Sequence, residues 1–273
     1  MKTGTLRVPG AELFHEVRGT GPMLLLVPGG GGDAGTFDGI ADVLARDFTV
    51  VAADPRGYSR SRLDSPEPVD QRVETQSEDC ARLIDHLGGG SAYVFGGSDG
   101  AIVVLDLLAR HPGRVRRAVV HEPPCVAVLP DAAEQLGFFG RVYEIYRAEG
   151  LAAAGAYMSE GIGGTLRPLP DPATLSPRAA ERVVRTVANM PLFMEHELRQ
   201  FTAYEPDLEA LAAVADRLVL AAGRETRGHL PYRPAAELAR RLGRELTEFP
   251  GGHGGYTEAP EEFAELLART LRG

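Results

Sequence analysis

The sequence predicts an α/β protein with a mostly parallel, doubly wound sheet of eight strands and one helical insertion. Short apolar runs alternate with helical patterns up to about residue 122 and again after residue 216. Glycine-rich connections separate these elements, and such alternation is typical of an open parallel sheet covered by helices on both faces. Between residues 123 and 216 helical patterns follow one another without a buried strand, which indicates an insertion in a single connection.

The expected strands begin with a hairpin around Pro9 and Gly10, because strand-length segments flank this turn signal. A continuous apolar run such as Met23–Val27, ended by Pro28 and four glycines, indicates a strand buried on both faces of the sheet. The expected strands are Thr5–Val8, Glu12–Val17, Met23–Val27, Phe48–Ala53, Ser91–Phe95, Val115–Val120, Arg217–Ala222 and Glu245–Phe249.

Between the strands, apolar residues recur at helical spacing, and glycine or proline follows several of these segments. The helices expected around the sheet are Thr36–Arg46, Gln71–Leu87, Ser98–His111, Pro234–Leu242 and Pro260–Leu271. Those expected in the insertion are Asp131–Glu149, Leu151–Met158, Ser176–Asn189 and Leu192–Tyr204. We therefore expect a core domain formed by residues 1–122 and 217–273, and a helical lid or cap formed by residues 123–216 over a pocket.

The composition excludes several classes of protein. The chain has 273 residues and a formal net charge of −9, and this negative field argues against nucleic acid or an anionic membrane surface as a partner. No apolar run approaches the roughly 18 residues of a membrane span, and Met1–Pro9 lacks the apolar segment of a signal peptide. Cys80 and Cys125 show no metal-ligand spacing, so we expect free thiols in the cytoplasm and no metal site. The sequence leaves a homodimer open.

The strongest local motif is Gly96-Gly97-Ser98-Asp99-Gly100, which matches G-x-S-x-G between an expected strand and an expected helix. A nucleophile on a sharp strand-to-helix turn needs neighbours without side chains, and its hydroxyl is then exposed at the helix N-terminus. Ser98 is therefore the candidate nucleophile.

With this motif the chain resembles the α/β-hydrolase family over nearly its full length. Three more segments carry the resemblance in the expected order, namely the oxyanion loop Leu24–Gly32, the turn Asp54–Ser61, and the histidine loop Gly251–Gly254 followed by Pro260–Ala264. Two positions depart from the family pattern, because Pro28 replaces the usual histidine of the oxyanion loop and Ser59 replaces the second glycine of the turn.

A serine hydroxyl is a weak nucleophile and requires an adjacent general base. His253 lies on a glycine-flanked loop after the last expected strand, where a base can reach the carboxyl edge of the sheet, and it is the expected base. His15 lies in the hairpin, and His86 and His111 lie at helix ends. Three further histidines are candidates for lining the pocket: His121, His196 and His229.

Two glutamates compete for the role of the acid that orients the histidine. The resemblance places the acid three residues after Gly223, but Thr226 stands there, so the neighbouring Glu225 is one candidate. Glu122 directly follows the strand Val115–Val120, where haloalkane dehalogenases and some lipases of this family carry their acid. We favour Glu122 and keep Glu225 as the alternative.

By the same resemblance, the backbone N–H groups of Gly30 and Asp99 would form an oxyanion hole. The Asp99 carboxylate would add negative charge near this hole, so we expect it to point away, toward the N-terminus of its helix.

These features predict a cofactor-free serine hydrolase that cleaves a small-molecule carboxylic ester, thioester or lactone through an acyl-enzyme. A serine nucleophile and the absence of tryptophan argue against haloalkane dehalogenase chemistry, and the serine also argues against epoxide hydrolase chemistry. Two alternatives stay open, because the fold alone does not separate them. One is a lyase or cyclase that uses the same Ser98 and His253, and the other is a ligand-binding protein on a retained hydrolase pocket.

The insertion is rich in aromatic residues and methionine, which suits an apolar or aromatic substrate. The candidate substrate-binding residues are Phe138, Tyr143, Tyr157 and Phe193. The alternative is that such residues at helical spacing pack the insertion onto the core.

Overall fold

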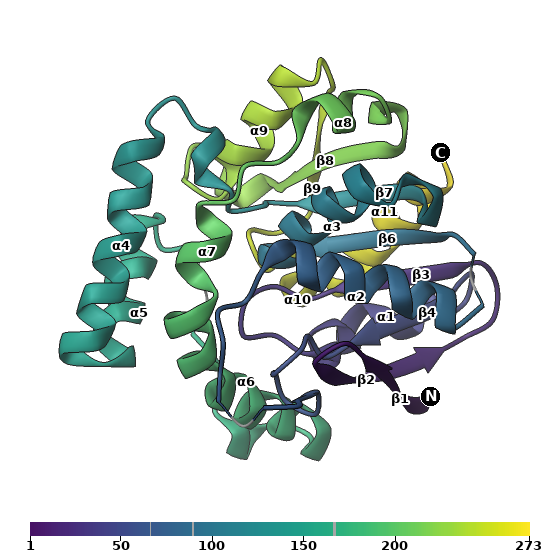
Figure 1. The fold of residues 1–273 in the computed structure, drawn as a ribbon, viewed down its shortest axis with the longest axis horizontal. Coiled ribbons are helices and arrows are strands. Elements are labelled where there is room, and N and C mark those ends of the chain that lie inside the picture. The colour runs from purple at the N-terminus through teal and green to yellow at the C-terminus, as the bar shows by residue number, and fades with distance from the viewer. Residues whose placement is uncertain (66, 89, 166–167) are drawn as a thin grey trace.

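The computed structural model describes residues 1–65, 67–88, 90–165 and 168–273, and its centre is a twisted sheet (Figure 1). The strand order is β1-β2-β4-β3-β6-β7-β8-β9. The strands β1 and β2 pair antiparallel, as do β2 and β4, and every later pair along this path is parallel. The strands are β1 (Lys2–Val8), β2 (Ala11–Arg18), β3 (Met23–Val27), β4 (Thr49–Ala53), β5 (Arg62–Leu63), β6 (Ala92–Gly97), β7 (Val115–His121), β8 (Leu218–Gly223) and β9 (Leu246–Phe249).

This arrangement confirms the expected mostly parallel α/β sheet. The expectation of eight strands needs one correction, because β5 pairs with the start of β2 and makes a ninth strand. The strand β5 has only two residues, Arg62 and Leu63, which is too short for a periodic pattern to reveal.

The α-helices are α1 (Asp38–Leu44), α2 (Val73–His86), α3 (Asp99–Arg110), α4 (Ala132–Glu149), α5 (Leu151–Gly161), α6 (Pro177–His196), α7 (Leu198–Thr202), α8 (Leu208–Ala212), α9 (Tyr232–Arg241), α10 (Gly255–Glu258) and α11 (Pro260–Arg272). In the described part of the chain, the short 3₁₀ turns are η1 (Ala34–Phe37), η2 (Pro112–Arg114), η3 (Val126–Val128), η4 (Pro172–Thr174), η5 (Ala215–Arg217) and η6 (Arg224–Thr226). Within the described ranges, no helix is both long and apolar enough to cross a membrane.

Helices cover both faces of the sheet. Figure 1 shows α2 and α3 in front of it and α1 and α11 behind it. On the first face, Ile84 and Leu105 pack with strand residues such as Val94 in one buried cluster. On the second face, Ile40 and Leu267 belong to another buried cluster. Because the parallel strands are buried on both faces, they appear in the sequence as the continuous apolar runs noted above.

The helices α4 to α7 follow β7 and lie beside one edge of the core (Figure 1). They form a third buried cluster, in which Phe139 and Phe193 are joined by Tyr58 from the core. Two helices form here, as expected from Ser176–Asn189 and Leu192–Tyr204, but the predicted break near residue 190 is wrong, because α6 continues through Pro191 to His196.

The chain breaks at Glu197, between α6 and α7. Its φ of −124° and ψ of −52° depart from helical values, and its side chain is buried. Proline at position 191 removes one hydrogen bond from the helix without ending it. The break therefore coincides with an inward-turned carboxyl group.

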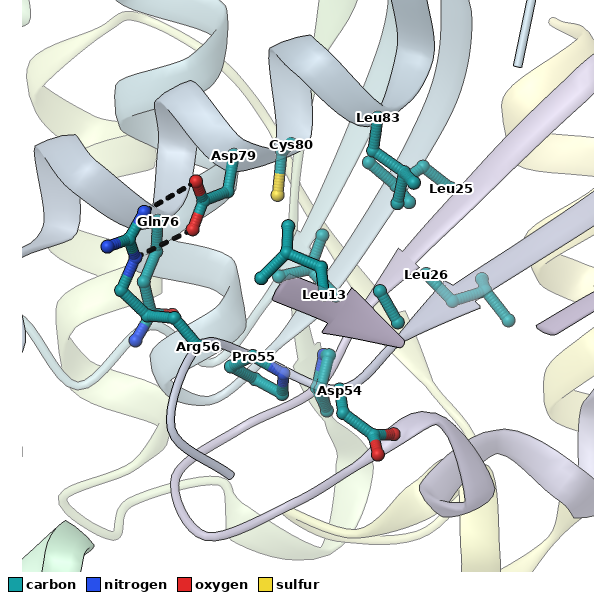
Figure 2. A pocket seen from close by; sticks show the side chains of 13 residues that line it. Leu13, Leu25, Leu26, Asp54, Pro55, Arg56, Gln76, Asp79, Cys80 and Leu83 are labelled. Atoms are coloured by element: carbon teal, nitrogen blue, oxygen red, sulfur yellow. Dashed lines mark hydrogen bonds and ion pairs between the residues drawn. The ribbon is translucent and has the colours of Figure 1, made fainter. Parts of the chain in front are cut away.

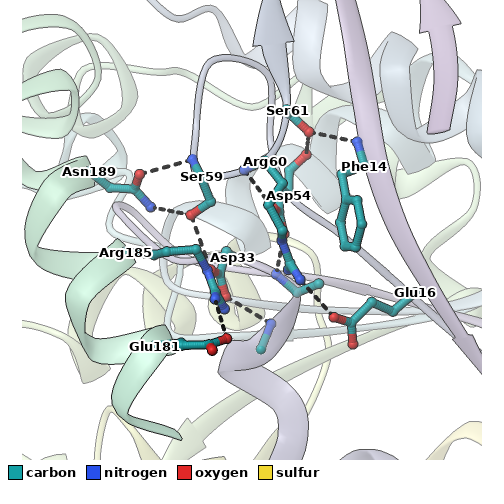
Figure 3. A network of polar contacts seen from close by, with 12 residues as sticks. Phe14, Glu16, Asp33, Asp54, Ser59, Arg60, Ser61, Glu181, Arg185 and Asn189 are labelled. Atoms are coloured by element: carbon teal, nitrogen blue, oxygen red, sulfur yellow. Dashed lines mark hydrogen bonds and ion pairs between the residues drawn. The ribbon is translucent and has the colours of Figure 1, made fainter. Parts of the chain in front are cut away.

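Polar contacts tie α6 to the core (Figure 3). The Arg178 side chain binds Asp38 and Glu16, at 2.7 and 2.6 Å. The Arg185 Nε donates to Asp33 Oδ2 at 2.5 Å. These ion pairs hold the outer face of the helix against β2, η1 and α1.

The amide of Asn189 makes the deepest of these contacts. Its Nδ2 donates to the carbonyl oxygen of Gly31 at 2.9 Å and to Ser59 Oγ at 2.9 Å, and its Oδ1 accepts from the Ser59 N–H at 3.0 Å (Figure 3). Ser59 has a φ of 51°, in the left-handed region that favours glycine. The Asn189 amide therefore hydrogen-bonds to Ser59, the residue that replaces the family's glycine in this turn.

Candidate active site

Ser98 lies on the sharp turn between β6 and α3. Its φ of 55° and ψ of −128° are rare for a residue with a side chain, and such backbone strain clusters at functional sites. A Cβ atom at Gly96 would lie 2.3 Å from the carbonyl oxygen of Gly100, and one at Gly100 would lie 2.2 Å from that of Val27. Both glycines of the motif are therefore required by close backbone approach.

The structure brings Ser98, His253 and Glu122 into one hydrogen-bonded chain. The Ser98 Oγ lies 3.0 Å from Nε2 of His253, and the His253 Nδ1 lies 2.7 Å from Oε2 of Glu122. The three residues follow β6, β9 and β7, and these parallel strands end at the same edge of the sheet.

Glu122 is fully buried and is held as an anion. Its Oε1 accepts hydrogen bonds from the Gly223 N–H at 2.8 Å and from the Thr226 hydroxyl. Burial alone would raise the pKa of this carboxyl, but the hydrogen bond and charge of His253 and the Thr226 hydroxyl lower it to about 2. An anionic Glu122 accepts a hydrogen bond from the Nδ1–H of His253, which leaves Nε2 without a proton and able to accept from the Ser98 hydroxyl.

The alternative acid, Glu225, lies in η6 with its side chain exposed, whereas Nδ1 of His253 faces Glu122. Thr226 stands where the family resemblance would place the acid. Its hydroxyl binds Glu122 instead, so this position contributes to the site as a hydrogen-bond donor.

The residues expected to supply the oxyanion donors are Asp99, which directly follows Ser98, and Gly30 in the loop after β3. Asp99 is the first residue of α3, and the loop that contains Gly30 passes close to the nucleophile, since a Cβ at Gly29 would lie 2.8 Å from the Ser98 Cβ. The Asp99 carboxyl is buried and hydrogen-bonds to Glu197. A Cβ at Gly30 would lie 2.4 Å from Asp99 Oδ2, so the carboxyl lies against the oxyanion loop instead of pointing away from it, which corrects that expectation.

A cavity of about 370 Å³ opens beside Ser98 and His253. Its other lining includes apolar side chains from the helical segment 132–202 and from the chain after β8: Phe139, Met158, Ile162, Met190, Phe193, Leu198 and Leu230. Polar groups at its wall include Thr36, Arg182, Thr186, Thr202, Thr257 and Glu258.

Only one of the four candidate substrate-binding residues, Phe193, lines this cavity. Phe138 stacks on Tyr157 with ring centroids 5.5 Å apart, and Tyr157 is partly exposed. The Tyr143 hydroxyl donates to Glu195. Phe138, Tyr143 and Tyr157 are not among the residues that line this cavity, and helical periodicity does not tell which flank of a helix faces a cavity.

The three histidines considered for the pocket do not line it. His121 is fully buried without a hydrogen-bond partner in the described residues, and burial lowers its pKa to about 4. His196 binds Asp70 at 3.0 Å, and His229 is exposed near Gly163.

A second, smaller pocket of about 30 Å³ lies under β3 and α2, beside the ion pair of Arg56 with Asp79 (Figure 2). Its lining includes Leu25, Gln76 and Cys80, and it does not include the three residues of the hydrogen-bonded chain. Among the residues described, no group of three or more histidine, cysteine or acidic side chains could hold a metal ion.

Comparison with known proteins defines the class. The family model described as alpha/beta hydrolase fold matches residues 22–156. The chain is 38% identical over 275 residues to the uncharacterized hydrolase YraK of Bacillus subtilis. The match covers 98% of this chain and 95% of that protein. The chain therefore belongs to the alpha/beta hydrolase fold family and is a hydrolase of that fold.

A further relative and a solved structure are also similar to this chain. A zearalenone hydrolase of Bionectria ochroleuca is 35% identical over 123 residues, which is 44% of this chain and 47% of that protein. The structure of a thermophilic esterase from Thermogutta terrifontis, with malate bound, has a TM-score of 0.75 at 23% identity and covers 100% of this chain and 98% of that one. The second likeness supports the fold alone.

Proposed function

We propose that the protein is a serine hydrolase that cleaves a small-molecule carboxylic ester, thioester or lactone. The observation that carries this proposal is the hydrogen-bonded chain from Ser98 Oγ through His253 to Glu122, at 3.0 and 2.7 Å. The hydrolase YraK and the similar fold of an esterase agree with this reaction class.

In the proposed mechanism, Ser98 Oγ attacks the carbonyl carbon while His253 Nε2 takes the hydroxyl proton. Glu122 stabilises the resulting imidazolium through Nδ1. The backbone N–H groups of Gly30 and Asp99 stabilise the negative carbonyl oxygen of the tetrahedral intermediate. The bond to the leaving group then breaks as His253 returns the proton to it, and water releases the acyl group by the same proton transfers.

We also propose that the segment 123–216 acts as a lid that shapes the substrate cavity. Its side chains Phe139, Met158, Met190 and Phe193 form much of the apolar wall. Such a wall suits an apolar acyl or alcohol group.

Covalent labelling tests the reaction class. A fluorophosphonate should modify the wild-type protein at Ser98, and the reaction should be lost in Ser98→Ala and reduced by orders of magnitude in His253→Ala. A folded protein whose Ser98 does not react would contradict the proposal and favour a ligand-binding protein. Labelling without turnover of any ester, thioester or lactone would favour a lyase or cyclase that uses the same residues.

A further inference from the structure

A pair of buried carboxyl groups lies beside the nucleophile. Asp99 at the start of α3 is 4% exposed, and Glu197 at the break between α6 and α7 is 3% exposed. The two side chains hydrogen-bond to each other. A carboxylate only accepts hydrogen bonds, so this contact requires one proton between the two groups.

The remaining hydrogen bonds tell which group holds the proton. Glu197 Oε2 accepts from the Tyr58 hydroxyl at 2.8 Å and from the Gln76 amide at 3.2 Å, whereas no described side chain or backbone N–H donates to the Asp99 carboxyl. Donors favour the charged form of an acid. The charge therefore resides on Glu197 and the proton on Asp99.

The pKa shifts agree with this assignment. Burial, followed by the charge of Glu197, raises the pKa of Asp99 well above its ordinary value. Burial also raises the pKa of Glu197, but its bonds from Tyr58, Gln76 and Asp99 limit the rise. The other titratable groups near the pair are Tyr58 and Tyr256, whose raised pKa values keep both phenols neutral.

The Asp99 carboxyl lies close to the proposed oxyanion hole, where an extra negative charge would affect the reaction. A Cβ at Gly30 would be 2.4 Å from Asp99 Oδ2, so this carboxyl contacts the loop whose N–H is the proposed oxyanion donor. Asp99 also lines the cavity next to Ser98. An ionised Asp99 would oppose the negative charge that develops on the substrate oxygen, and this repulsion is strong where water is excluded.

We propose that Glu197 is a positioning residue that keeps the proton on Asp99, so that the side chain next to the nucleophile stays neutral while the oxyanion forms. The inference rests on the proposed function, because it requires a reaction with a negatively charged intermediate. It assigns a role in the reaction to a residue of the helical segment.

The test is the pH dependence of kcat/KM for p-nitrophenyl acetate, with the rate of Ser98→Ala subtracted at each pH. In Glu197→Gln, Asp99 loses its anionic neighbour, and the N-terminus of α3 favours its ionisation. We expect a new descending limb in the neutral range, with a fall of up to about tenfold per pH unit. In Asp99→Asn/Glu197→Gln this limb should disappear, because no ionisable group remains at the position.

Glu195→Gln is the matched control, since Glu195 lies two residues earlier and binds Tyr143 and Arg147 instead. It should keep the wild-type pH profile. A Glu197→Gln profile of wild-type shape, or a limb that persists in the double variant, would overturn the inference. If Ser98→Ala retained turnover, the proposed function would fail instead.

Infrared difference spectroscopy supplies a second readout in case Glu197→Gln does not fold. At pH 8 the wild-type protein should show a carboxylic-acid C=O band that is absent from Asp99→Asn. The absence of such a band in the wild type would overturn the inference.

Discussion

The sheet and the helical segment hold their parts of the cavity by different means. Around Ser98 the backbone itself leaves no room, since Cβ atoms at Gly96 and Gly100 would lie 2.3 and 2.2 Å from carbonyl oxygens. In the helical segment, a Cβ atom at Gly137 or Gly155 would meet no atom within 4 Å outside its own helix backbone, and one at Gly161 would meet the Phe138 ring. Backbone packing, and no single side-chain contact, therefore fixes the position of the nucleophile.

The helical segment depends on side-chain bonds for its placement. Arg178, Arg185 and Asn189 all lie on α6, and each binds the core through a side chain. The three groups of the hydrogen-bonded chain all come from the sheet half, whereas much of the apolar cavity wall comes from the helices. Changes in the sheet half should therefore affect the chemistry, and changes in the helical half should affect the fit and attachment of the cavity wall.

The largest effect is expected from Glu122→Gln. A neutral amide cannot stabilise the imidazolium, and the corresponding change in serine proteases lowers kcat by about 10⁴-fold. Glu225→Gln is the control, and it should stay within a factor of a few of wild type because Glu225 is exposed. The measurement is kcat for a chromogenic ester. Equal loss in both variants, or none in Glu122→Gln, would contradict the assignment.

Gly100→Ala tests the tight packing of the sheet half. The new Cβ would lie 2.2 Å from the Val27 carbonyl oxygen, so we expect the free energy of unfolding to fall by about 3 kcal/mol. Gly137→Ala in α4 is the control, and it should gain roughly 0.5–1 kcal/mol, because alanine favours a helix interior. Urea denaturation measures both. Similar changes in the two variants would remove the contrast between the halves.

The buried anion of the sheet half should also shape acid stability. The pKa of Glu122 is lowered to about 2 in the folded protein, against about 4.5 when unfolded. Its contribution is therefore present above about pH 4.5 and is lost as the pH falls from about 4.5 toward 2, and it amounts to about 3 kcal/mol. Unfolding of wild type and Glu122→Gln across this range should give a smaller pH slope for the variant. Parallel slopes would argue against a folded-state anion.

Asn189→Ala tests the attachment of the helical half. It leaves the Gly31 carbonyl and the Ser59 N–H without their partner, and we expect a loss of about 2 kcal/mol in unfolding free energy. Val187→Ala is the control on the same helix, since Val187 is 49% exposed, and it should change stability by about 0.5 kcal/mol or less. Unchanged stability of Asn189→Ala would show that other contacts hold α6 in place.

Much of the fold and the centre of the site can be predicted from the sequence. The inner parallel strands, such as β3 and β6, are buried on both faces and appear as apolar runs, and Ser98 and His253 lie in glycine-rich loops that mark turns at strand ends. The choice between Glu122 and Glu225 is harder to make from the sequence, because both follow a strand. Only the folded chain tells that one carboxyl is buried against His253 and the other is exposed.

The helical segment is harder to predict from the sequence. Phe193 and Phe138 both belong to apolar helical patterns, yet only Phe193 faces the cavity, because tertiary packing decides which flank of each helix is covered. No feature of the neighbouring sequence indicates that Glu197 contributes to the site. It stands in a continuous helical pattern, and its importance comes from residues distant in sequence, namely Tyr58, Gln76 and Asp99.

The formation of an acyl-enzyme on Ser98 tests the account most directly. The protein is mixed with excess p-nitrophenyl acetate, quenched in acid within milliseconds to seconds, and digested for mass spectrometry. The account predicts one acetyl group on the peptide that contains Ser98, at a higher level in Glu122→Gln if deacylation is slowed more than acylation, and none on that peptide in Ser98→Ala. Turnover of the ester with no adduct on Ser98 at any time, or unchanged turnover in Ser98→Ala, would contradict it.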